Sequence, residues 1–227
     1  MKKNLFLCLV LFFCAFSQAS HAAVLFSDLG TTAPPASLST YTVTPFDQGV
    51  QAAIPTGTDV TTIPGSPIPG DLITTANVNK RAIGDGWSTW SHGYTGVVYS
   101  SNGADTIVMN LPPDAGAFYF YAEPNVFSTF LISAVTDSGA SSGDISVNGS
   151  SGANGFAFYT TAGESITTIT VTADPAANGF AIGEFGIAAN QAGPEAIPTL
   201  NEWGMIILAL FIAGISIKMI KKQGAEI

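Results

Sequence analysis

The sequence predicts an all-β body, an antiparallel β-sandwich of jelly-roll type, with an N-terminal signal helix and one C-terminal transmembrane helix. Apolar and polar residues alternate in short segments such as 105–111 and 169–173, whereas no segment of 23–193 keeps an apolar period of 3.6 residues. Asn-Gly pairs at 102–103 and 178–179 are typical of the tight turns between such strands. Short strands separated by turn signals are characteristic of a sandwich.

The alternation and the turns together locate the expected strands along the body. We expect strands at 24–29, 105–111, 117–122, 127–136, 144–147, 155–160, 169–173 and 179–187. The segment 31–70 is rich in proline, including 63–70 with Pro64, Pro67 and Pro69, and proline interrupts a central strand. We therefore expect long loops or edge segments there, and a regular sheet that begins near Leu72.

The charge of the chain is unevenly distributed. The net charge is −9, but five of the seven basic residues lie near the two ends. The segment 23–203 holds 15 acidic residues against Lys80 and Arg81, which gives −13. Nucleic-acid binding needs a basic surface, so a nucleic-acid partner is excluded.

The N-terminus has the three parts of a secretory signal peptide. Lys2 and Lys3 precede the apolar run 4–16, and a small-x-small site ends at Ala22. We predict cleavage between Ala22 and Ala23 after delivery to the export translocon; an uncleaved anchor is the alternative. Both cysteines lie in the apolar run, so the mature chain has neither a disulfide nor a thiolate site.

The C-terminus combines an apolar run with a basic end. Residues 203–217 carry no charge, and Lys221 and Lys222 follow shortly after. The 18 residues of 203–220 make a helix about 27 Å long at about 1.5 Å per residue, enough to cross the hydrocarbon core if Lys218 extends to the interface. We predict a transmembrane helix at 203–220 and a cytoplasmic tail at 221–227. A buried core helix is the alternative.

A specific motif lies directly before this run. It reads Ile197, Pro198, Thr199, Leu200, Asn201, Glu202, Trp203 and Gly204. With the apolar helix and basic end it resembles the IPTL-CTERM protein-sorting domain, over about the last thirty residues. The resemblance implies recognition at Ile197–Leu200 by an exosortase-like membrane protease of Gram-negative bacteria. It also implies transient anchoring in the inner membrane, followed by delivery to the cell surface or outside the cell.

The motif departs from the family pattern in three ways, and its local chemistry fits exposure to an enzyme. Asn201 replaces the usual serine, the basic cluster is lysine rather than arginine, and five residues follow it. Pro198 lacks an N–H and keeps Ile197 extended. The predicted plan is a signal peptide at 1–22, an extracytoplasmic body at 23–192, a linker with the motif at 193–202, and then the helix and tail.

The segment 84–94 is the most unusual part of the body. Trp87, Trp90 and Tyr94 can line a sugar-binding face, because aromatic rings stack on the C–H faces of sugars. The alternative is that these rings pack in the core, as large aromatic residues usually do. His92 is the only histidine outside the signal peptide, which argues against a Ser-His-Asp triad and a histidine-rich metal site.

No pair of carboxylates is marked for catalysis, and most acidic residues lie in predicted turns. Calcium is the metal that an acidic body with oxygen ligands would bind. The candidate ligands are Asp137, Asp144, Asp174, Asn178 and Glu184, although no calcium motif is present and a solvated surface is the alternative.

Taken together, these features predict an exported structural or adhesive protein of the cell surface or extracellular matrix, and not an enzyme. One alternative is a secreted carbohydrate-binding protein or glycan hydrolase, which requires an exposed tryptophan or two carboxylates in a cleft. Another is a membrane-tethered periplasmic protein that keeps its C-terminal tail.

Overall fold

The computed structural model describes residues 23–190 except 162, together with residues 204, 206–212 and 215. The chain divides into two units, 1–191 and 192–227, which are considered separately below. The predicted signal peptide 1–22 lies outside the described residues, as do residues 197–203 of the sorting motif.

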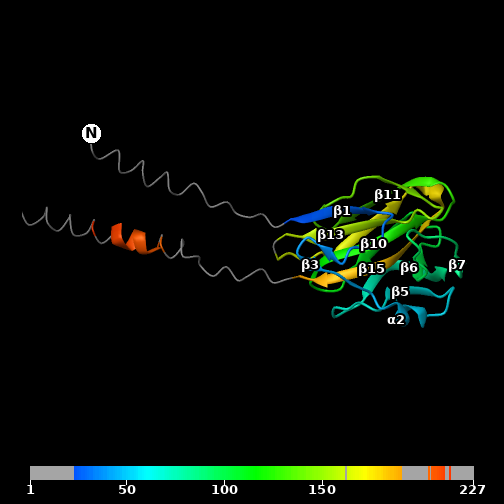
Figure 1. Cartoon of the computed structure of the whole chain (residues 1–227), viewed down its shortest axis with the longest axis horizontal. Coiled ribbons are helices and arrows are strands. Elements are labelled where there is room, and N and C mark those ends of the chain that lie inside the picture. Colours follow the sequence, from blue (N-terminus) through cyan, green and yellow to red (C-terminus); the bar gives the residue numbers. More distant parts are fainter. Residues whose placement is uncertain (1–22, 162, 191–203, 205, 213–214, 216–227) are drawn as a thin grey trace, which may run out of the picture. The chain divides into compact units, whose positions relative to one another are not determined.

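The regular elements in the described part of the first unit are almost all strands, joined by turns and loops (Figure 1). Those of the main sheet are β1 (Val24–Gly30), β4 (Thr44–Pro45), β5 (Asp59–Ile63), β6 (Leu72–Ile83), β7 (Gly86–Trp87), β8 (Val97–Ser100), β9 (Thr106–Asn110), β10 (Ala115–Pro124), β11 (Thr129–Thr136), β12 (Ile145–Asn148), β13 (Asn154–Thr160), β14 (Thr168–Ala173) and β15 (Phe180–Ala189). A separate two-stranded sheet pairs β2 (Ser37–Leu38) with β3 (Tyr41–Thr42). The helical elements are α2 (Gln48–Ala52) and the 3₁₀ turn η1 (Pro175–Ala177).

The main sheet is continuous and curled. Its strand order is β1-β13-β10-β15-β8-β6-β9-β14-β11-β12, with β4 paired to β15 and both β5 and β7 paired to β6. Every pairing is antiparallel except that of β6 with β7. The prediction of a mainly antiparallel β body is therefore confirmed, and the strands form one bonded sheet instead of two separate ones.

Each of the eight segments expected to be strands contains one, but Val97–Ser100 was not expected. This strand, β8, lies between β15 and β6 in the middle of the sheet, and Val97, Val98 and Tyr99 are all buried. A strand that is covered on both faces has no polar face, so its sequence does not alternate.

The proline-rich segment forms short elements, as expected. Pro45 lies in the two-residue strand β4, which pairs with β15 at Gly186. Asp47 then caps α2, where its side chain accepts a hydrogen bond from the Gly49 N–H (2.8 Å). This short helix was not expected, since five residues are too few to show a helical period.

Strand β10 is buried on both faces, and the candidate site lies against its outer face. Phe118 and Phe120 point into the main core, which the curled sheet encloses. Tyr119 and Tyr121 point the other way, into a second apolar cluster. Trp87 of β7 and Trp90 of the loop that follows belong to this second cluster, which buries the outer face of the sheet at β10 and β15.

In the second unit, the described residues 204, 206–212 and 215 are helical, and large apolar side chains such as Leu210 and Phe211 are exposed. No helix among the residues that the structure describes has the length and apolar character needed to cross a membrane. The predicted span 203–220 falls partly, and the predicted tail 221–227 wholly, outside them.

Candidate functional site

The candidate site forms where residues 86–94, here called the Trp loop, lie on the outer face of β10 and β15. The indole Nε1–H of Trp87 donates to Oε2 of Glu123 on β10 (2.8 Å). The indole Nε1–H of Trp90 donates to Oε2 of Glu184 on β15 (3.1 Å). Because β10 and β15 are neighbouring strands, two buried carboxylates hold the Trp loop at two points three residues apart.

Glu123 has no exposed surface, and its carboxylate is well satisfied. Its Oε1 accepts from the Thr89 hydroxyl (3.2 Å) and from the Gly152 N–H (3.2 Å), in addition to the bond from Trp87 to Oε2. Burial raises the pKa of Glu123, and the bond from Trp87 is the largest of the opposing effects. Glu123 therefore joins the Trp loop to the turn after β12 through one side chain.

Glu184 reaches the Trp loop from a β-bulge. Two residues of β15, Glu184 and Phe185, oppose the single residue Phe120 of β10, and Glu184 has a φ of +52°. A non-glycine residue in this region costs about 1–3 kcal/mol, which the surrounding contacts must offset. The Oε1 atom of Glu184 lies 2.8 Å from Nε2 of His92, and His92 also has a positive φ, of +40°. Burial raises the pKa of Glu184, and the bond with His92 opposes this.

The three aromatic residues predicted to form a sugar-binding face have different environments. Trp90 is 5% exposed and packs at 6.1 Å, between ring centroids, from Tyr94. The Tyr94 hydroxyl donates to the Val97 carbonyl (2.8 Å), and burial raises its pKa. Trp90 and Tyr94 thus have the packing role given as the alternative, whereas Trp87, although only 9% exposed, borders a pocket.

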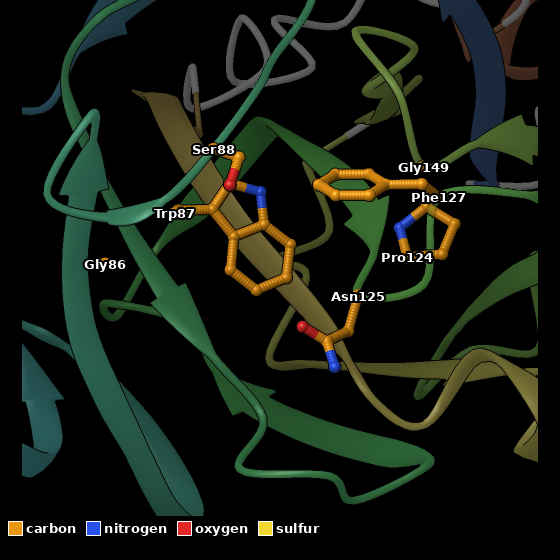
Figure 2. A pocket seen from close by; sticks show the side chains of 7 residues that line it. All are labelled: Gly86, Trp87, Ser88, Pro124, Asn125, Phe127 and Gly149. Atoms are coloured by element: carbon orange, nitrogen blue, oxygen red, sulfur yellow. The ribbon is translucent and has the colours of Figure 1, made fainter.

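This pocket has a volume of about 260 Å³ and lies among three chain segments (Figure 2). Its lining residues are Gly86, Trp87, Ser88, Pro124, Asn125, Phe127 and Gly149. They come from β7 and the Trp loop, from the end of β10 with the turn that follows, and from the turn after β12. Figure 2 shows the Trp87 indole and the Phe127 ring on opposite sides of the pocket.

The candidate calcium ligands have separate partners instead of a common centre. Asp137 accepts from the Thr167 hydroxyl (2.7 Å), and Asp174 caps η1 through the Ala176 N–H (2.8 Å). Asn178 ends η1 in a left-handed conformation, Glu184 binds the Trp loop, and Asp144 is exposed. Among the described residues, no group of three or more His, Cys, Asp or Glu side chains is placed to hold a metal.

Sequence reasoning did not select Glu123 or Phe127. Glu123 directly follows the apolar segment 117–122. A single acidic residue at the end of a buried strand needs hydrogen-bond partners, and this was the one sequence feature that could have indicated its role. Phe127 was expected to begin a strand, but it lies in the turn before β11 and is 65% exposed. Glu123 and Glu184 each accept a hydrogen bond from a tryptophan, and neither carboxylate lines the pocket beside Trp87.

The predicted processing sites lie at or beyond the ends of the described residues. Ala22 is outside it, whereas the Ala23 N–H donates to the Thr161 hydroxyl (3.1 Å). Ile197, Pro198, Thr199, Leu200, Glu202 and Trp203 are outside it, and Gly204 is helical.

The comparisons with known proteins bear on the C-terminus alone. Residues 195–215 match the family model of the IPTL-CTERM motif, which includes the whole of 197–204. The comparison with curated proteins found no match. The comparison with solved structures found none either. The motif identifies a C-terminal sorting signal on an exported protein, and it implies processing by a sorting machinery such as an exosortase-like enzyme.

Proposed function

We propose that this chain is a surface-displayed structural or adhesive protein: its signal peptide directs export, and an exosortase-like enzyme removes its C-terminal tail. The observation that carries the proposal is the IPTL-CTERM match at 195–215. Before that cleavage, the apolar helix anchors the chain in the inner membrane. The β body is then the part of the protein that remains at the cell surface or in the matrix.

The boundaries of the body support this division of the chain. Strand β1 begins at Val24, two residues after the predicted cleavage position at Ala22. Strand β15 ends at Ala189, eight residues before Ile197. The main core formed by the described residues lies within 24–189, so removal of both ends leaves that core intact.

The proposed role is not catalytic. The two buried carboxylates, Glu123 and Glu184, each accept hydrogen bonds from a tryptophan and from a second side chain. An acid held by several donors in a covered site is suited to fixing a loop. A general acid or base must instead reach its substrate.

The test follows the tail in a host that carries an exosortase-like enzyme. An epitope is added after Ile227, and membrane and surface fractions are probed for the body and for the epitope. We expect the surface form to lack the epitope, and we expect the variant Pro198→Ala with Glu202→Gln to keep it and stay in the membrane. Pro194→Ala, in the linker before the motif, serves as the matched control and should be processed normally.

Two results would count against the proposal. Retention of the epitope in the parent chain would favour the membrane-tethered alternative. Normal processing of the motif variant would show that the motif is not what the enzyme recognises.

A further inference from the structure

We propose that the pocket beside the Trp loop binds one neutral pyranose ring of a glycan, held between Trp87 and Phe127. The proposal relies on the proposed surface display only for the source of the glycan. The pocket volume of about 260 Å³ is just below the usual range of small-molecule sites, about 300–1,000 Å³. It therefore fits a single ring at the end of a chain or branch better than a long oligosaccharide.

The walls of the pocket provide apolar contact on two sides. Phenylalanine is among the residues most often buried, whereas Phe127 is 65% exposed, so its ring is accessible to a ligand. The Trp87 indole lies opposite (Figure 2), and its N–H is already bonded to Glu123. What Trp87 can still present to the pocket is therefore apolar, and a pyranose offers C–H faces that match apolar rings on both sides.

Polar groups lie at the rim, where the hydroxyl groups of a sugar would be. The Asn125 amide nitrogen donates to the Asn178 carbonyl (3.2 Å), so its Oδ1 is left to accept a hydrogen bond. The hydroxyl of Ser88, an exposed residue, has no partner among the described residues. More of the accessible lining of the pocket is polar than apolar, so the two aromatic rings stand among groups that can form hydrogen bonds.

The pocket is held open before any ligand binds. A backbone hydrogen bond from the Gly149 N–H to the Ser128 carbonyl (2.8 Å) joins two of its segments, and one from the Asn125 N–H to the Gly179 carbonyl (3.0 Å) ties the turn after β10 to the start of β15. The hydrogen bond from the Trp87 indole N–H to Glu123 holds the Trp87 side chain in place. A preformed site loses less conformational entropy on binding than a site that must order itself.

Charge selects a neutral ligand. None of the lining residues is charged, and the segment 23–203 that contains the pocket has a net charge of −13. An anionic ligand would meet the negative potential of this segment. A cation, the Arg81 guanidinium, lies beside Gly86 but does not line the pocket. The observations therefore favour a neutral hexose over an acidic sugar or a phosphate.

The test is saturation-transfer NMR on the full chain, purified in a detergent without a sugar headgroup. The probes are the methyl pyranosides of glucose, galactose, mannose and glucuronic acid, with p-cresol as an aromatic probe. We expect a neutral methyl pyranoside to bind with a Kd of about 1 mM, as for a ligand of this size. Phe127→Ala should weaken that binding at least tenfold, and this substitution should preserve the fold because Phe127 is exposed. Leu131→Ala, at an exposed β11 residue outside the pocket, should leave it unchanged.

Three outcomes would overturn the inference: no transfer to any neutral methyl pyranoside at ~20 mM, well above the expected Kd; equal binding by the Phe127→Ala variant; or binding of p-cresol or the glucuronide alone. The purified chain can be tested whether or not its tail is processed. Failure of this binding is therefore distinct from failure of the proposed sorting.

Discussion

Replacing Glu123 by alanine should strongly destabilise the body, because this one carboxylate satisfies three donors. Two of them, the Trp87 indole N–H and the Gly152 N–H, belong to buried residues, and the third is the Thr89 hydroxyl. A buried donor left without an acceptor costs about 1–3 kcal/mol, so the two buried donors together cost about 2–6 kcal/mol. Burial raises the pKa of the Glu123 carboxyl because the charged form is poorly solvated, so removing this carboxylate offsets part of that cost at pH 7. We expect a net loss of about 2–4 kcal/mol in the free energy of unfolding.

The assay is equilibrium urea denaturation of the full chain at pH 7, followed by tryptophan fluorescence. Glu123→Gln keeps one acceptor oxygen and the side-chain size, so it should lose about half as much as the alanine variant. Asp144→Ala, at an exposed carboxylate, is the control and should change stability by less than about 0.5 kcal/mol. A Glu123→Ala loss as small as that of the control would refute the argument that Glu123 anchors the Trp loop.

Two further predictions concern pH and backbone packing. Because burial raises the pKa of both Glu123 and Glu184, the folded state binds more protons than the unfolded state just above pH 4.5. The free energy of unfolding should therefore fall as pH rises from 4.5 through the raised pKa values. In urea titrations at several pH values, the double variant Glu123→Gln with Glu184→Gln should lack this pH dependence. An unchanged pH dependence would show that these two carboxylates do not cause it. Gly149→Ala would place Cβ against the Val126 carbonyl oxygen, so we expect the free energy of unfolding to fall by about 1–3 kcal/mol in urea denaturation. Ser150→Ala, at an exposed neighbour, is the control, and a loss no larger than that of the control would contradict this prediction.

The strands of the body could be predicted to different degrees, depending on how each is buried. Alternation marked β9 and β14, because each has one face in the core and one toward solvent. Strand β8 has three consecutive buried residues and therefore no alternation to detect. Strand β10 is also buried on both faces, but segment 117–122 within it was predicted from alternation and turn signals together with the other strands.

The candidate site could be predicted only in part. Segment 84–94 was selected for its aromatic residues, and the structure places Trp87 at a pocket and Trp90 beneath the surface. Their different roles depend on Glu123 and Glu184, which lie 36 and 94 residues away in the sequence. No local pattern links residues at such separations, so the pairs become visible only when β10 and β15 are adjacent.

The sequence by itself identified the C-terminal sorting signal and the β character of the body. The sorting motif is a linear segment, and the alternation of polar and apolar residues is a local property of a strand. The tertiary structure decided which residues of the body border a pocket. The curl of the sheet brings β7, the turn before β11 and the turn after β12 together, and only there do Trp87 and Phe127 border one pocket. That arrangement arises from long-range pairing and from buried carboxylates whose cost is offset by distant donors.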